Sequence, residues 1–120
     1  MNNYKELILW QKSVELAVKI YEITKGFPGD EIYGLTSQMR RSVVSISSNI
    51  AEGAGRNTKK DFSRFLGISY GSSCELDTQV TIAFKVKLIT EAMLTTIQND
   101  INEIQKMHWA LKRSLNQTKS

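Results

Sequence analysis

The sequence contains few side chains of the kinds that catalyse reactions or bind metal ions. Its single histidine is His108 and its single cysteine is Cys74. A di-iron helical bundle requires two Glu-x-x-His elements, but Gln105 stands three residues before His108. A structural zinc site requires four ligands, usually Cys and His, and only these two residues are available. We therefore predict no metal site and no cofactor.

The side chains needed for nucleophilic catalysis are also scattered. A Cys or Ser nucleophile needs a base and a group that orients the base. His108 lies on an apolar helix face, where a packed and hydrogen-bonded histidine is the commoner role. The segment "GAGRNTKK" resembles part of a phosphate-binding loop, but such a loop follows a strand, whereas the segment before it has helical periodicity. Glu52 could pair with Glu75 as two buried carboxylates, although its i, i+4 spacing from Arg56 fits an ordinary ion pair. We predict that the protein has no catalytic residues and is not an enzyme.

Positive charge is the clearest functional signal in the sequence. Residues 39–64 contain six basic and two acidic residues, so their net charge of 6 − 2 = +4 equals that of the whole chain. A local excess of this kind attracts phosphate. We predict that the six basic residues bind nucleic acid: Arg40, Arg41, Arg56, Lys59, Lys60 and Arg64. The alternative is that Arg40, Arg41 and Arg64 pair with acidic residues across an interface, while Lys59 and Lys60 face solvent. The candidate acidic partners are Glu52, Glu75 and Asp77.

Four segments have the apolar period of amphipathic helices. In the second, Met39, Val43, Ile46 and Ile50 recur at steps of three and four. The four predicted helices span about residues 4–26, 31–55, 58–89 and 91–116. Either Asp30 or Thr36 is expected to cap the second helix, and Thr58 the third. The sequence thus predicts one all-α domain over residues 1–120, an antiparallel up-down four-helix bundle.

Two of these helices have more apolar surface than one stripe requires. The first has two apolar lines, of which the second contains Leu9, Leu16, Ile20 and Ile23. The third has a strip of small residues opposite its core face, including Gly67, Gly71 and Cys74, although each glycine costs about 1 kcal/mol in a helix interior. Extra apolar surface indicates either a broad face within one bundle or an interface between copies. We predict a symmetric homo-oligomer whose interface includes six residues: Leu16, Ile20, Ile23, Gly67, Gly71 and Cys74.

Two segments resemble a known family. These are "YGLTSQMRRSVVSISSNIAEGAGR" and "KKDFSRFLGISYGSSCELDTQ". They closely resemble the four-helix-bundle proteins encoded in intervening sequences of some bacterial 23S ribosomal RNA genes. The resemblance implies a homopentamer, and kinship with the accessory variability protein of diversity-generating retroelements, a basic pentamer that binds nucleic acid and a reverse transcriptase. It implies no catalytic residues.

These observations give one functional hypothesis and one alternative. No apolar run approaches the roughly 18 residues of a membrane helix, so we expect a bacterial protein of the cytoplasm. The hypothesis is a non-catalytic, oligomeric adaptor that binds RNA, or an enzyme acting on nucleic acid, through its basic surface. The alternative is a protein–protein assembly module with no role in nucleic-acid binding.

Overall fold

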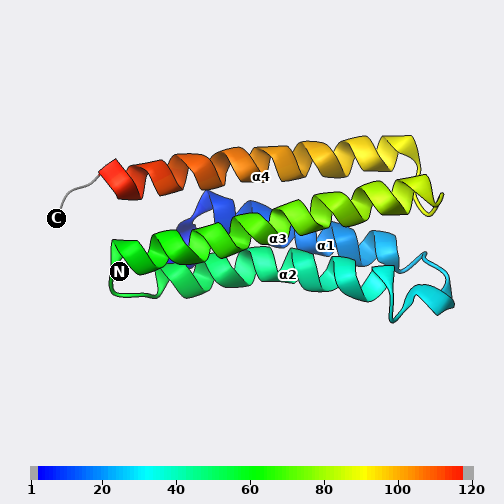
Figure 1. Cartoon of the computed structure of the whole chain (residues 1–120), viewed down its shortest axis with the longest axis horizontal. Helices are drawn as coiled ribbons and strands as arrows, with labels where there is room; N and C mark the ends of the chain where they lie inside the picture. The colour runs from blue at the N-terminus through cyan, green and yellow to red at the C-terminus, as the bar shows by residue number, and fades with distance from the viewer. Residues whose placement is uncertain (1–2, 118–120) are drawn as a thin grey trace.

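The computed structural model describes residues 3–117, which are all-α, as predicted. Four long helices lie side by side in a rod of 50 × 23 × 20 Å, and the chain reverses direction at each connection between them (Figure 1). The helices are α1 (Ile8–Thr24), α2 (Leu35–Ala54), α3 (Lys59–Lys85) and α4 (Glu91–Gln117). Two short 3-10 helices precede α1 and α2, namely η1 (Tyr4–Glu6) and η2 (Gly29–Glu31). The predicted domain, 1–120, includes five terminal residues outside the described range.

The first helix is shorter than the sequence predicted. The side chain of Asn3 accepts a hydrogen bond from the Lys5 amide and caps η1. Leu7 is then extended, with φ −72° and ψ 123°, so α1 begins only at Ile8. At 1.5 Å per residue, this helix of 17 residues is roughly 15 Å shorter than α3 or α4, which have 27 each. The end of the bundle at which α4 terminates therefore extends past α1 (Figure 1).

The second helix begins four residues later than predicted, and neither expected residue caps it. Gly34 occupies the N-cap position and has no side chain with which to cap. Instead, Oε1 of Glu31 accepts the Leu35 amide hydrogen at 3.1 Å. A carboxylate here also interacts favourably with the positive end of the helix dipole. Asp30 and Thr36 are therefore not caps.

The third helix begins as predicted but ends four residues earlier. Oγ1 of Thr58 accepts the Asp61 amide hydrogen at 3.1 Å and caps the helix. At the other end, the Leu88 amide donates to the Ala83 carbonyl at 2.8 Å, and the Lys87 amide donates to Phe84 at 2.9 Å. This is the hydrogen-bond pattern of a Schellman motif, which needs a left-handed residue and usually has glycine there. Lys87 has that conformation, with φ 68°, which is why the sequence lacked the usual stop signal.

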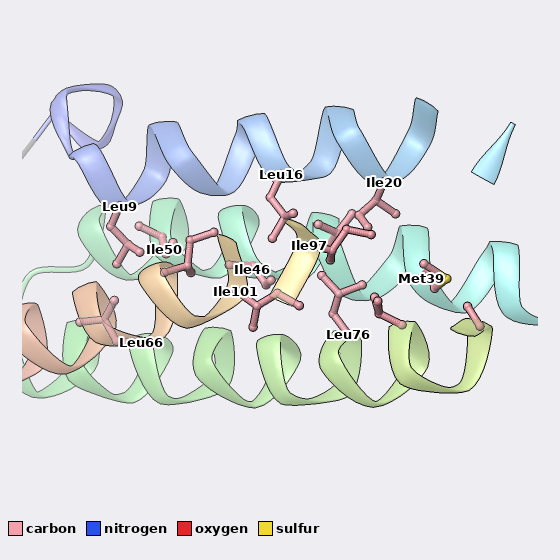
Figure 2. Packing of buried hydrophobic residues seen from close by; sticks show 14 of the residues in the cluster. Leu9, Leu16, Ile20, Met39, Ile46, Ile50, Leu66, Leu76, Ile97 and Ile101 are labelled. Atoms are coloured by element: carbon pink, nitrogen blue, oxygen red, sulfur yellow. The ribbon is translucent and has the colours of Figure 1, made fainter. Parts of the chain in front are cut away.

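Apolar side chains from all four helices fill the space between them (Figure 2). The predicted inner faces of α2 and α3 are buried, including Met39, Ile46 and Leu66. On α1, the second apolar line faces this core. Leu16 is 1% exposed and Ile20 is 0% exposed within a single chain, so the prediction that they contact another copy is wrong. Half-buried Ile23 also packs against the core.

Close approach of two helices within the chain occurs at Gly53 and not at Gly67 or Gly71. A Cβ added at Gly53 would lie 2.8 Å from Cβ of Phe65 and 3.0 Å from Cδ1 of Phe62, which brings the end of α2 against the start of α3. By contrast, a Cβ at Gly71 would meet nothing within 4 Å, and one at Gly67 only Nζ of Lys112 at 3.6 Å. Within residues 3–117, no backbone atom of another helix therefore lies within 4 Å of a Cβ at Gly67 or Gly71.

Candidate nucleic-acid interface

The six predicted basic residues do not form one surface. Arg40 and Arg41 lie near the start of α2, whereas Arg56, Lys59, Lys60 and Arg64 lie around its junction with α3. Fourteen residues of helix separate Arg40 from Ala54, which corresponds to roughly 21 Å. Figure 1 shows these two parts of α2 at opposite ends of the rod. The sequence analysis treated the six residues as one group because the net charge of residues 39–64 does not take into account their distance along the helix axis.

Arg40 connects α2 with α1. Its Nε donates a hydrogen bond to Oγ1 of Thr24 at 2.8 Å, and its NH2 nitrogen donates to the Tyr21 carbonyl at 3.4 Å. The guanidinium also lies 4.6 Å from the centre of the Tyr21 ring. These contacts of Arg40 are not with acidic residues, as the alternative predicted, and they also leave its guanidinium only partly available to a ligand. Arg41 is exposed.

At the α2–α3 junction, two arginines contact the same aromatic ring. The guanidinium of Arg56 lies 4.8 Å from the ring centre of Phe65, and that of Arg64 lies 4.4 Å from it. Each arginine also has an acidic neighbour nearby in the sequence, at 3.0 Å for Arg56 and Glu52, and at 3.8 Å for Arg64 and Asp61. The ring therefore fixes the position of two cations at the end of the bundle. We call Arg56, Lys59, Lys60, Arg64 and Phe65 the basic junction.

The cations of the basic junction are accessible to a ligand. The side chains of Arg56 and Arg64 are 43% and 58% exposed, and exposed ion pairs of this kind contribute little to stability. Nε of Arg56 is itself buried and has no hydrogen-bond partner within residues 3–117, so a ligand would reach the exposed remainder of this side chain. Lys60 is exposed in the first turn of α3, at the positive end of the helix dipole. With Glu52 and Asp61 counted, the net charge is 4 − 2 = +2.

His108 is a core residue. Its Nε2 lies 2.7 Å from Oγ of Ser69 and its Nδ1 lies 2.9 Å from the Ile104 carbonyl. Burial lowers the pKa of His108, and the hydrogen bond to Ile104 opposes this shift only in part. Ser69 is completely buried, so a substrate cannot reach its hydroxyl. Across the described part of the chain, no three His, Cys, Asp or Glu side chains are grouped as metal ligands.

The sequence analysis missed Phe65. An aromatic residue flanked by basic ones is the signal that could have identified it, since "KKDFSRFL" places Phe65 directly after Arg64. The Glu52–Arg56 ion pair, in contrast, is the i, i+4 contact that the spacing indicated. Gly71 and Cys74 are exposed on α3, whereas Gly67 is half-buried beside Nζ of Lys112 from α4, and the role of all three as an interface stays a prediction. No helix of the described chain has the length and apolar character needed to cross a bilayer.

Comparisons with known proteins agree with the fold. A crystal structure of a protein of unknown function from the S23 ribosomal protein family of Bacteroides thetaiotaomicron is similar, with a TM-score of 0.82 and 26% sequence identity. The similarity covers 88% of this chain and 96% of that one. No curated protein matches the chain. The family model described as 23S rRNA-intervening sequence protein matches residues 5–110. Because this match covers most of the sequence, the chain belongs to the 23S rRNA-intervening sequence protein family.

Proposed function

We propose that this protein is a non-catalytic, homo-oligomeric bundle that binds RNA through its basic junction. The observation that supports the proposal most directly is the placement of Arg56 and Arg64 on one ring, with exposed guanidiniums. Arginine donates several hydrogen bonds in a fixed geometry that suits phosphate oxygens. Lys60 adds a positive charge one turn before Arg64 on α3. The bacterial cytoplasm is the compartment we propose for this activity.

Binding at the basic junction would depend on the backbone of the RNA and not on its sequence. Phosphate contacts position a protein on nucleic acid but carry no base specificity. The ion pairs of Arg56 and Arg64 are exposed, so a phosphate can replace or share the carboxylate partner at a small energetic cost. A net charge of about +2 at one junction gives weak binding. Several copies held together would gain affinity by avidity.

The outer face of α3 supports self-association. Ile68 and Ile82 are exposed on this helix, Val86 is exposed directly after it, and the small residues Gly71 and Cys74 are exposed as well. Exposed apolar side chains gathered on one element are typical of an interface. We propose that copies of the chain pack through this face into a closed ring, with the five subunits that the family resemblance implies. The ring would repeat the basic junction around one axis.

A salt titration with matched variants tests RNA binding. Labelled structured RNA is titrated with the wild type and with a variant in which the four cations of the basic junction are replaced by Gln. The matched control replaces Lys5, Lys25, Lys85 and Lys87 by Gln, which makes the same change in net charge at exposed positions elsewhere. We expect the affinity of the wild type to fall with salt, with a logarithmic slope of about −0.9 for each duplex phosphate contacted. The junction variant should lose affinity and slope, while the control keeps most of both. Weak binding that is independent of salt would refute the proposal.

The second candidate is a protein–protein assembly module with no nucleic-acid role. It is favoured by the exposed apolar face of α3 and by the acids that already neighbour Arg56 and Arg64. Affinity purification from the native cell distinguishes the two candidates. The assembly module is supported if protein partners persist after nuclease treatment and if no RNA is retained in the untreated sample. An RNA-dependent association with a nucleic-acid enzyme supports the adaptor.

A further inference from the structure

A groove runs between α3 and α4 at the end of the bundle that extends past α1. Its volume is ≈ 670 Å³, and the residues lining it include Gly67 and Tyr70 from α3 and Trp109, Lys112 and Arg113 from α4. A second hollow of ≈ 480 Å³ adjoins it, shares Tyr70, Trp109 and Arg113, and adds Lys106. The two hollows thus lie on either side of the same aromatic and basic side chains. None of the residues that line either hollow is acidic.

The aromatic surface of the groove is exposed to solvent, and contacts with the core hold one of its two rings in place. Trp109 is 62% exposed, which is unusual for an indole on a well-formed helix. Tyr70 packs edge-to-face against buried His108, with ring centres 6.0 Å apart. His108 is itself held by Ser69, so the core fixes the position of the tyrosine ring. A solvent-exposed ring on a rigid helix offers a flat surface on which a planar ligand can stack.

Charge along α4 is sharply divided between its two halves. Residues 91–103 contain three acidic residues and no basic one, whereas residues 104–117 contain Lys106, Lys112 and Arg113 and no acidic residue. The acidic half is paired with α1 through two ion pairs, Lys12–Glu103 and Lys19–Asp100. The three cations of the other half form no ion pair with any described residue. Positive charge near a helix C-terminus also suits the helix dipole, but the dipole explains neither the exposed indole nor the hollow beside it.

Gly67 allows one of these cations to reach across the groove. Nζ of Lys112 would lie 3.6 Å from a Cβ at Gly67, so the ammonium group of α4 extends over the backbone of α3. A larger residue at position 67 would occupy this space. Cations and an aromatic ring therefore lie within one groove.

We propose that this groove binds unpaired nucleotides of a single-stranded nucleic acid. A base stacks on the exposed face of Trp109, and the neighbouring phosphates are bound by Lys112 and Arg113. Proteins that bind single strands combine a positively charged groove with aromatic stacking surfaces in this way. A base inside a duplex has both faces covered by the adjacent base pairs and cannot stack on the indole, so the groove distinguishes single strands from duplexes, which the basic junction does not. Both sites lie at the same end of the rod, where α2 ends, α3 begins and α4 ends (Figure 1).

The inference shares with the proposed function the premise that nucleic acid is the ligand, but it depends on different residues. The competing occupant of an apolar groove is a second copy of this chain. The charge of the groove argues against a two-fold contact, because such a contact would bring two sets of cations together without acids. The experiment below separates these outcomes.

Fluorescence of Trp109 provides a direct test. The chain has two tryptophans, and Trp10 is half-buried against Tyr4, so Trp10→Phe leaves Trp109 as the only indole reporter. The Trp10→Phe variant is titrated with oligouridine RNA and oligothymidine DNA of about 12 nucleotides, a length within the site sizes of single-strand binders. An RNA duplex of similar length is the comparison ligand. We expect the single strands to quench the indole and the duplex to leave its emission nearly unchanged. A preference for RNA over DNA would indicate a contact with the 2′-hydroxyl.

Variants then assign the binding to the groove. In the wild-type background, anisotropy of labelled oligonucleotides should show single-strand affinity reduced roughly ten-fold by Trp109→Ala, and at least as much by Lys112→Gln with Arg113→Gln. Gly67→Leu, which fills the groove, should act similarly. The matched controls are Tyr33→Ala, an exposed aromatic residue outside the groove, and Lys5→Gln with Lys25→Gln; both should leave the affinity unchanged.

The outcomes separate this inference from the proposed function. Duplex binding that requires the basic junction, with no quenching of Trp109 by either single strand, overturns the groove site alone. Quenching equal for duplex and single strands also overturns it. Emission that changes on dilution of the protein, and not with oligonucleotide, assigns the groove to a second copy of the chain. Failure of every oligonucleotide and of structured RNA to bind overturns both.

Discussion

Nε2 of His108 lies 2.7 Å from Oγ of Ser69, and this contact connects α4 to α3 inside the core. Oγ of Ser69 also lies 2.8 Å from the carbonyl oxygen of Ile46, and Nδ1 of His108 lies 2.9 Å from that of Ile104. A neutral imidazole has one N–H and a serine has one O–H, so two hydrogens serve three contacts. An imidazolium would supply the third, yet burial outweighs this gain and lowers the pKa of His108.

This balance predicts how stability depends on pH. Because the folded-state pKa lies below the unfolded value of about 6.5, the unfolded chain binds more protons as the pH falls. The free energy of unfolding should be constant above that value and should decrease by up to about 1.4 kcal/mol per pH unit below it, until the folded-state pKa is reached. Urea unfolding between about pH 8 and pH 5 measures the effect. His108→Leu is the control, since the chain has no other histidine. If this variant retains the same loss below pH 6.5, the assignment is wrong.

The contact at Gly53 predicts a destabilising methyl group. Gly53→Ala would place its Cβ 2.8 Å from Cβ of Phe65 and 3.2 Å from the Phe62 carbonyl oxygen. Because neither atom lies at the end of a flexible side chain, the helices must separate, and we expect a loss of about 1–3 kcal/mol in the free energy of unfolding. Gly71→Ala is the matched control, since its Cβ meets nothing; it should add about 1 kcal/mol through helix propensity. Chemical unfolding of both variants decides, and equal effects would contradict this account of the helix contact.

The left-handed residue between α3 and α4 predicts a stabilising substitution. Lys87 has φ 68°, a conformation that costs an L-residue on the order of 1–2 kcal/mol and glycine almost nothing. Lys87→Gly should therefore raise the free energy of unfolding by about 1 kcal/mol, less the flexibility that glycine adds to the unfolded chain. Lys85→Gly, at a helical position in the same turn, should lower it instead. Thermal unfolding compares the two, and a destabilised Lys87→Gly variant would refute the argument.

The outer face of α3 predicts the effect of a bulky substitution on assembly. If copies of the chain meet there, the wild type should show several times the monomer mass of 13.6 kDa in light scattering. Gly71→Leu should dissociate the oligomer without unfolding it, because no atom of the described residues lies within 4 Å of this Cβ. Thr95→Leu, an exposed position on α4, is the control for added surface leucine. A wild type that is monomeric at all concentrations would remove the basis for an interface on this face.

Periodicity predicted the helices and much of the core because it depends only on which residues recur on one side. The inner faces of α2 and α3 follow it, from Met39 to Val80. Where a helix starts or ends depends on single hydrogen bonds. Thr58 was recognisable as a cap, but the side chain of Glu31 accepts from an amide four residues later, and Lys87 replaces the usual glycine. On α1, two apolar lines were visible, and periodicity could not decide which of them faces the core.

The candidate sites were less predictable because they combine residues from different helices. Composition identified the basic stretch, but only the structure separates Arg40 from the basic junction and places Arg56 and Arg64 on Phe65. The groove was missed because the charges of α4 cancel when the helix is counted as a whole. Its pairing with Tyr70 depends on how α3 and α4 pack, which no local pattern contains.

Because α1 is short, the two halves of α4 differ in how easily they unfold locally. The last completely covered side chain of α4 is His108, and beyond it only Leu111 and Leu115 pack against the core. Amide protons in the final two turns of α4 should therefore exchange with deuterated solvent by fraying of those turns alone, whereas protons near Ile101 should wait for the whole bundle to unfold. Lys112 and Arg113 can thus adjust to an incoming strand, whereas Trp109, which directly follows covered His108, keeps its position and the acidic half of α4 stays packed against α1.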